Sequence, residues 1–384
     1  MRRCSRREFL ARSACSAAAL GAAGTIAGCP AAPEPPFTPV HGSARVCAVR
    51  GQDLADMTRD ALDGVGGIRA FVQPGETVFI KANCMTAGFM SGDVVARGEC
   101  SKPEIVMAVA EACLEAGAAK VTIGDAAQVD RFSWEALTSL DGATNYAAEA
   151  ARLNAAYGDK VDLACLAADS PSWTEIPSPY TSLGTIKVSS LVTEADKVIS
   201  IPVAKTHMMC KVTYSLKNCL GMTPPLGMSL GPVKSRLGMH AAAGGIEQCF
   251  LDVVKAVRPH LAIIDYSICV EGNGPVNVGM GFSRRVDLRD RLGDWVILAS
   301  SDLAAADATA SRVIGVDPLG VKYLRMAYEQ GLGQISEGLI EVVGERLDSL
   351  YVEWEHASLA KSIPASVKSY APYSCAAWAE GGEA

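Results

Sequence analysis

Residues 201–221 read IPVAKTHMMCKVTYSLKNCLG, and this stretch is richer in polar chemistry than any other part of the chain. An apolar strand is predicted over 198–203, followed by a Lys-Thr-His sequence and then by a turn and a helix. In an open α/β sheet, ligands bind beyond the carboxyl ends of the strands. The stretch therefore predicts a buried strand with a binding site at its end. The side chains that make this site are Lys205, His207, Lys217 and Asn218.

Strands and helices alternate on both sides of this stretch. Residues 77–82, TVFIKA, are β-branched and apolar, as buried parallel strands are. Ser101 begins a capping box, Ser-Lys-Pro-Glu, that predicts a helix ending at Gly117, and strand 120–123 follows. Further strands are expected at 44–50, 185–188, 261–265, 295–299 and 339–343, and further helices at 53–71, 143–157, 245–257, 302–314 and 317–330. The pattern predicts an α/β fold with a mainly parallel sheet covered by helices on both faces, in a Rossmann-like three-layer arrangement.

The N-terminus is typical of an export signal. Residues 5–10, SRREFL, form a twin-arginine pattern, and the apolar run 14–27 is too short to span a bilayer. Cys29 ends a lipobox, IAGC, and is the expected site of acylation; the alternative is an ordinary signal cleaved nearby, with Cys29 incidental. We expect export by the twin-arginine machinery to an extracytoplasmic location, and membrane contact only through an N-terminal lipid anchor.

The remaining chain divides into three parts by composition. After the signal (1–28) comes a proline-rich tether (29–43), then an α/β domain (44–348) and an irregular tail (349–384). Without residues 1–28 the chain has 30 basic and 41 acidic residues, because the signal holds five arginines and one glutamate. Such an acidic protein is not expected to bind nucleic acid, which attracts cationic surfaces.

The 13 cysteines do not predict a metal centre. They are scattered, with no C-x-x-C and no iron–sulfur run of the ferredoxin kind. Most lie in apolar stretches, where a free cysteine behaves as a small hydrophobic residue. We expect buried thiols and no iron–sulfur cluster.

Several predicted strands end in polar residues, and parallel strands would bring these ends together at one edge. The residues are Lys81 and Asn83, Asp125, Lys205 and His207, and Asp265. Asp302 and Asp317 also follow apolar segments but are better explained as helix N-caps. Lysines grouped on an acidic protein indicate an anion site, in which Lys81, Asn83 and Lys205 would hold the anion. Lys211 is equally well explained as a solvated side chain.

His207 and His240 are candidates for proton transfer or metal binding. His207 would exchange protons with Asp265 or Glu271. A metal site made of these histidines with Asp125, Asp265 or Glu271 is an alternative, although no short ligand spacing supports it; a structural role for His240 is another. The sequence Glu271-Gly-Asn-Gly-Pro predicts a flexible loop that lets Asn273 approach a ligand. Long loops are expected over 222–240 and 271–282.

Taken together, these segments resemble the DUF362 family of uncharacterised proteins. The resemblance rests on FIKAN (79–83), SKPEIV (101–106), VTIGDA (121–126), IPVAKTH (201–207), SLKNCLGM (215–222), His240, IIDYSICVEGNGP (263–275) and DLAAADATASRVIGVDP (302–318). The family usually has proline at the position of Ala82, and many relatives carry a four-iron four-sulfur module that this chain lacks. The resemblance implies a redox context but no particular reaction or cofactor.

Two functions of different classes follow from the sequence. The first is an exported enzyme that binds a small anionic ligand or cofactor at the strand ends. The second is a lipid-anchored, non-catalytic protein that holds a metal or cofactor for a redox partner protein. The expected ligand-binding residues are Lys81, Asn83, Asp125, Lys205, Lys217, Asn218, His240 and Asn273, and the expected catalytic residues are His207, Asp265 and Glu271.

Overall fold

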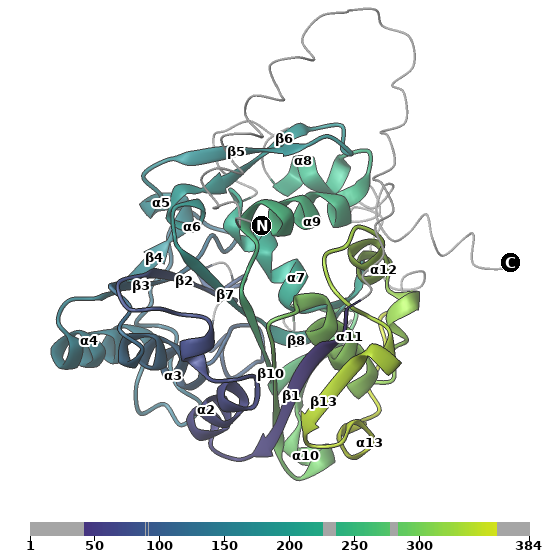
Figure 1. Ribbon diagram of the computed structural model, residues 1–384, viewed down its shortest axis with the longest axis horizontal. Coiled ribbons are helices and arrows are strands. Elements are labelled where there is room, and N and C mark those ends of the chain that lie inside the picture. Colours follow the sequence, from purple (N-terminus) through teal and green to yellow (C-terminus); the bar gives the residue numbers. More distant parts are fainter. Residues whose placement is uncertain (1–41, 89, 91, 226–235, 277–282, 359–384) are drawn as a thin grey trace, which may run out of the picture.

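The structure is a computed structural model that describes residues 42–88, 90, 92–225, 236–276 and 283–358 (Figure 1). The predicted signal, most of the tether, Cys29 and the end of the tail lie outside these residues, as do parts of both predicted long loops. The strands are β1 (Ala44–Gly51), β2 (Thr77–Ala82), β3 (Lys120–Asp125), β4 (Val161–Cys165), β5 (Trp173–Ser178), β6 (Gly184–Ser189), β7 (Lys197–Ile201), β8 (Val203–His207), β9 (Lys211–Thr213), β10 (Leu261–Gly272), β11 (Ser283–Asp287), β12 (Trp295–Ser300) and β13 (Ile340–Gly344). The helices are α2 (Leu54–Gly64), α3 (Pro103–Glu115), α4 (Tyr146–Tyr157), α5 (Leu166–Asp169), α6 (Ser190–Thr193), α7 (Ser215–Asn218), α8 (Arg236–Ala241), α9 (Gly245–Val257), α10 (Arg289–Leu292), α11 (Leu303–Val313), α12 (Lys322–Glu329) and α13 (Leu347–Leu350), with short 3-10 turns η1 (Ile68–Ala70), η2 (Cys219–Met222), η3 (Pro318–Gly320) and η4 (Glu337–Leu339).

The main sheet has the strand order β13-β1-β12-β10-β7-β2-β3-β4. Strands β10, β7, β2, β3 and β4 are parallel to one another, whereas β12 is antiparallel to both of its neighbours, β1 and β10. The α/β fold with a mainly parallel sheet is therefore confirmed. Strand β12 is the exception. Among the described residues between β10 and β12, the regular elements are the antiparallel strand β11 and the short helix α10, and none is a crossover helix that would restore the parallel direction.

Helices cover both faces of the sheet (Figure 1). Helices α2, α3 and α4 pack together on one face, and α7, α9, α11 and α12 form a second group on the other. The central strands are mostly apolar; every residue of β10 and β12, for example, is buried, the charged Asp265 and Glu271 of β10 included. This two-sided cover explains why the strands appear in the sequence as continuous apolar runs.

The strand that leads into the site is longer than the sequence predicted. β7 ends at Ile201, and after Pro202 the chain continues as β8 to His207. β8 is held between β10 on one side and the short antiparallel strand β9 on the other, with Lys205 opposite Thr213. Lys205 and His207 thus lie within a strand rather than beyond it, and both side chains are buried.

Two local predictions are corrected by the structure. Ser101 does not cap α3: the N-cap is Lys102, without a side-chain cap bond, and Ser101 Oγ instead donates to Ile201 O (2.7 Å) and accepts from Asn83 N (2.8 Å). Asp265 does not end a strand, because β10 runs on through it to Gly272. Ser101 therefore joins two strand ends that lie beside the predicted site.

Other local predictions are confirmed. Asp302 caps α11 by accepting from Ala305 N (2.9 Å), and Asp317 accepts from Leu319 N (3.0 Å). The nine cysteines within the described part of the chain are all buried free thiols. The predicted irregular tail (349–384) differs at its start, because α13 extends to Leu350; residues 351–358 contain neither helix nor strand, and Trp354 there is buried against Tyr266 at 5.6 Å between ring centroids.

Candidate functional site

A cavity of about 550 Å³ lies at the carboxyl ends of β2, β3 and β8, between these strands, α7 and α8. Eight of the eleven predicted site residues line it: Lys81, Asn83, Asp125, Lys205, His207, Lys217, Asn218 and His240. These residues come from separate elements, so the predicted convergence of strand ends is present in the structure. The remaining wall is largely apolar, with Met208, Leu220, Pro275 and Val276 among its residues. This volume and composition are ordinary for a small-molecule site.

Lys81 is neutralised by a carboxylate at one end of the cavity. Its Nζ lies 3.0 Å from Asp125 Oδ1 and also donates to Asn218 Oδ1 (3.1 Å). Asp125 is fixed in turn, because its Oδ2 accepts from Cys84 N (2.5 Å). Both members of the ion pair are almost completely buried, which favours a structural role over capture of an anion by Lys81.

Asn218 and Gly221 connect α7 closely to this ion pair. Asn218 Nδ2 donates to Lys81 O (3.0 Å) and to Ser200 Oγ (3.1 Å), so its amide bridges β2 and β7. A Cβ at Gly221 would lie 2.5 Å from Lys81 Nζ and even closer to Asp125. Only glycine fits where the chain passes over the pair, and this close passage brings Lys217 and Leu220 to the cavity wall.

Lys205 has a different environment from Lys81. Its Nζ donates to Asn83 Oδ1 (2.5 Å) and to Glu99 O (2.6 Å), both of them uncharged acceptors. No carboxylate within the described part of the chain forms an ion pair with it; the Glu99 carboxylate pairs with Arg97 instead. Burial lowers the pKa of Lys205 to about 8.

His207 is held as a neutral imidazole. Its Nδ1 accepts from Met209 N (3.0 Å) and, more weakly, from Cys210 N (3.4 Å). Burial, followed by the nearby charges of Lys217, His240 and Lys205, lowers the pKa of His207 well below its usual range. With Nδ1 occupied as an acceptor, the proton of the neutral ring is on Nε2, so the ring can offer the cavity a donor.

Three predicted residues do not line the cavity. Asp265 is in the interior of β10, fully buried against Lys102. Glu271, at the end of β10, binds Arg291 (2.6 Å) and Arg284 (2.5 Å). Asn273 is buried, and its loop reaches the cavity through Pro275 and Val276 instead. The predicted proton exchange between His207 and either carboxylate has no support in this arrangement.

The environment of Glu271 is that of a permanent anion. Burial alone would raise its pKa, but hydrogen bonds from Arg291, from the Glu355 backbone and from Arg284 outweigh burial and lower the pKa of Glu271 to about 2. A carboxylate with such a pKa is a poor proton acceptor at neutral pH. Its contact with Glu355 N (2.8 Å) instead fastens the C-terminal segment to β10.

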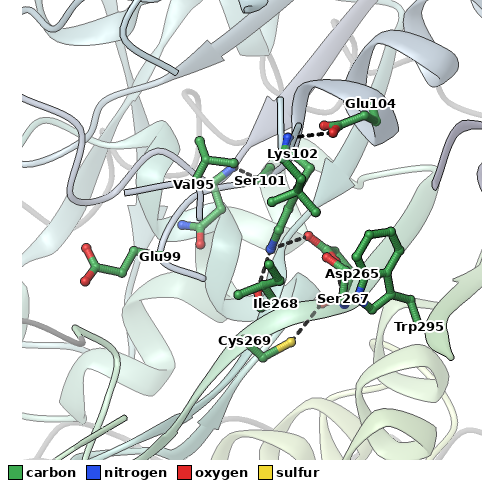
Figure 2. Close-up of polar contacts among 12 residues, drawn as sticks. Val95, Glu99, Ser101, Lys102, Glu104, Asp265, Ser267, Ile268, Cys269 and Trp295 are labelled. Atoms are coloured by element: carbon green, nitrogen blue, oxygen red, sulfur yellow. Dashed lines mark hydrogen bonds and ion pairs between the residues drawn. The ribbon is translucent and has the colours of Figure 1, made fainter. Parts of the chain in front are cut away.

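The Lys102–Asp265 ion pair was not foreseen from the sequence. Lys102 Nζ lies 2.9 Å from Asp265 Oδ2 and donates to Ile268 O (2.5 Å), and both side chains are fully buried (Figure 2). Asp265 also accepts from Ser267 N (2.8 Å). The pairing of β10 with β8 shifts register between Asp265 and Val270, so Lys102 stabilises the irregular part of β10. Lysine before proline at a helix start gives no sequence signal for this contact.

The described residues contain no group of three or more His, Cys, Asp or Glu side chains arranged to hold a metal ion. Within the same residues, no helix is both long and apolar enough to cross a bilayer. What the cavity does offer is the Lys205 amine, the Lys217 side chain, the His207 imidazole and the Asn83 amide beside apolar walls. Cationic and neutral donors next to apolar walls suit an anion that carries an organic group.

The fold is that of an α/β protein with a cavity of small-molecule size at the carboxyl ends of its parallel strands. Residues 78–312 match the family described as a domain of unknown function, DUF362, and the chain belongs to this family. It is 29% identical over 287 residues to the thylakoid-associated protein sll1697 of Synechocystis sp., an alignment that covers 74% of this chain and 76% of that protein.

A solved structure with partial likeness is the lactate racemase apoprotein from Thermoanaerobacterium thermosaccharolyticum. The likeness has a TM-score of 0.35 at 12% identity and covers 59% of this chain. This chain spans about half (51%) of the racemase chain. Nothing about the function of this protein follows from a likeness at that level.

Proposed function

We propose that the protein binds a small organic anion in the cavity, with Lys205 and Lys217 facing the anionic group. The observation that carries the proposal is the contrast between two buried lysines of the same cavity. Lys81 has a carboxylate at 3.0 Å, whereas the described partners of Lys205 are the neutral oxygens of Asn83 and Glu99. A buried cation without a counter-ion is unfavourable, and an anionic ligand would supply the missing charge.

Thermal stabilisation by defined anions tests this proposal. Three probes are suitable. Phenyllactate carries a carboxylate and an aromatic ring, pyridoxine 5′-phosphate carries a phosphate and an aromatic ring, and inorganic phosphate has no ring. Lys205→Met keeps the length of the side chain but removes its charge. Loss of one charge-assisted contact, about 1.5–3 kcal/mol, should weaken binding roughly 10- to 100-fold.

Lys211→Met is the matched control for the binding experiment. Lys211 is on β9, close to the same strand, but it is exposed and does not line the cavity. This variant should bind the probes as the wild type does. If Lys205→Met is stabilised as strongly as Lys211→Met, or if sodium chloride at equal ionic strength has the same effect as the probes, the cavity does not bind anions through Lys205.

We also propose that the protein is exported and lipid-anchored, in a context that includes a redox partner. The support is the twin-arginine pattern at 5–10 and the lipobox ending at Cys29. A fatty-acid label should be incorporated in cells and lost in Cys29→Ser. Equal labelling of the two proteins would contradict acylation at this residue. The alternative of a non-catalytic metal holder has no specific observation in its favour within the described residues.

A further inference from the structure

Three lysines are buried near the strand ends, and one of them differs from the others in its partners. Lys81 and Lys102 each have a carboxylate within 3.0 Å. Lys205 is buried to the same extent but donates only to the neutral oxygens of Asn83 and Glu99 among the described residues. Burial without a counter-charge favours the uncharged amine. The uncharged amine is the nucleophilic form of lysine.

The size of this effect at neutral pH is large. The pKa of Lys205 is about 8, whereas that of an exposed lysine is about 10.4. At pH 7 the fraction of Lys205 in the neutral-amine form is therefore roughly a hundredfold or more higher than for an exposed lysine. Most Lys205 side chains remain cationic at pH 7, so the same residue serves anion binding. The neutral fraction increases as the pH rises toward and beyond about 8.

A hydrogen-bond donor is placed on the same wall of the cavity. Lys205 and His207 are two residues apart on β8, and every second residue of a strand lies on the same face. Both residues line the cavity. Since His207 Nδ1 accepts from Met209 N, the neutral ring carries its proton on Nε2. A donor beside an amine is what a carbonyl compound needs for attack at carbon, because negative charge develops on its oxygen.

We propose that Lys205 forms an imine with an anionic aldehyde or ketone bound in this cavity, with His207 Nε2–H hydrogen-bonded to the carbonyl oxygen. The proposal rests on the anion site proposed above and specifies its ligand class. The Nζ lone pair attacks the carbonyl carbon, a nitrogen–carbon bond forms, and the carbon–oxygen π electrons move to oxygen. Both amine protons then leave with that oxygen as one water molecule, which gives the carbon–nitrogen double bond. No oxidant or reductant takes part.

Reductive trapping tests the proposal with two matched pairs of probes. Phenylpyruvate and pyridoxal 5′-phosphate carry a carbonyl group; phenyllactate and pyridoxine 5′-phosphate are the corresponding alcohols. The purified protein is incubated with a stoichiometric amount of one carbonyl probe and reduced with borohydride, and the labelled peptide is identified by mass spectrometry. We expect a single label at Lys205, formed by the carboxylate or the phosphate probe according to which anion the site prefers.

Lys205→Arg separates imine formation from anion binding. Arginine keeps the charge and the donors but does not form the imine, so labelling at this position should be lost while the alcohol probes still stabilise the protein. If even the wild type shows neither labelling at Lys205 nor stabilisation by the alcohol probes, the proposed anion site itself is wrong. Stabilisation of the wild type by the alcohols without any label at Lys205 would overturn the imine alone.

The pH dependence of labelling in the wild type provides a test that does not need a folded variant. The rate at Lys205 should rise with pH and level off above about 8, following its neutral amine. Labelling of an ordinary exposed lysine, by contrast, continues to rise toward about pH 10. A label that is spread over surface lysines, with Lys205 no faster than Lys211 at pH 7, would overturn the proposal.

Discussion

Replacing Asp265 with alanine should lower the free energy of unfolding by about 3–5 kcal/mol, because it leaves the Lys102 ammonium buried without its counter-ion. The Lys102 and Asp265 side chains are both fully buried, and Lys102 Nζ lies 2.9 Å from Asp265 Oδ2 (Figure 2). Ser267 N would also lose its acceptor. Equilibrium denaturation of the purified variant in urea measures the change.

The site should respond to the same substitution. Lys102 fixes Ile268 O in the irregular part of β10, and Val270, two residues further on, is opposite Lys205 in β8. Movement of this segment would disturb the strand that carries the Lys205 amine, so probe binding should weaken as well. We expect no such effect from a substitution that leaves β10 in place.

Two controls make the prediction about Asp265 specific. Glu341→Ala removes an exposed ion pair with Arg45, and the cost should stay below about 1 kcal/mol. The double variant Lys102→Met/Asp265→Leu removes both charges and should recover much of the stability lost in the single variant. A loss of less than about 1 kcal/mol in Asp265→Ala would show that water or another group satisfies Lys102.

The order of strands and helices could be predicted because it depends on local pattern. β2 lies where the run TVFIKA predicts it, and α9 has the bounds expected from its apolar periodicity. The prediction failed at β10, where Asp265 interrupts an apolar run and therefore resembles a strand end. Its charge is tolerated inside the strand because Lys102, distant in the sequence, neutralises it. A tertiary partner of this kind cannot be inferred from neighbouring residues.

The same limit applies to the candidate site. Parallel strands bring their carboxyl ends to one edge, so the group at Lys81, Asp125 and Lys205 could be predicted from strand positions alone. The distinct environments of these lysines could not. Lys81 has Asp125 at 3.0 Å, whereas the described acceptors of Lys205 are neutral, and this difference depends on distances that only the folded chain defines. The chemistry of the cavity follows from that difference.

Asp307→Ala should have an effect on stability comparable to that of Asp265→Ala, and it should act on the helix that forms one cavity wall. Asp307, on α11, accepts from Ser215 N (2.8 Å), Leu216 N (3.1 Å) and Ser215 Oγ at the start of α7. Alanine would leave the two buried backbone N–H groups without an acceptor, at a cost of about 1–3 kcal/mol each before relaxation, whereas Ser215 Oγ would keep Leu303 O (3.2 Å) as an acceptor. We expect a total loss of about 3–5 kcal/mol, and weaker anion binding because α7 carries Lys217.

Asp307→Asn isolates the charge of this residue. Burial raises the pKa of Asp307 to about 7, although hydrogen bonds from Ser215 and Leu216 oppose the change. The unfolded chain has a pKa of about 3.9 at this position, so between about pH 4 and about pH 7 the folded state binds the additional proton. Its stabilising contribution is complete below about pH 4 and is lost as the pH rises through about 7.

The comparison of wild type with Asp307→Asn across this pH range therefore has a definite sign. The asparagine cannot ionise, so the wild type should lose stability relative to the variant by up to about 4 kcal/mol as the pH is raised from about 4 to about 7. Urea denaturation of both proteins at each pH measures the difference, in which the other titrating groups cancel. A difference that does not change with pH would mean that the hydrogen bonds from α7 outweigh burial and keep Asp307 ionised throughout.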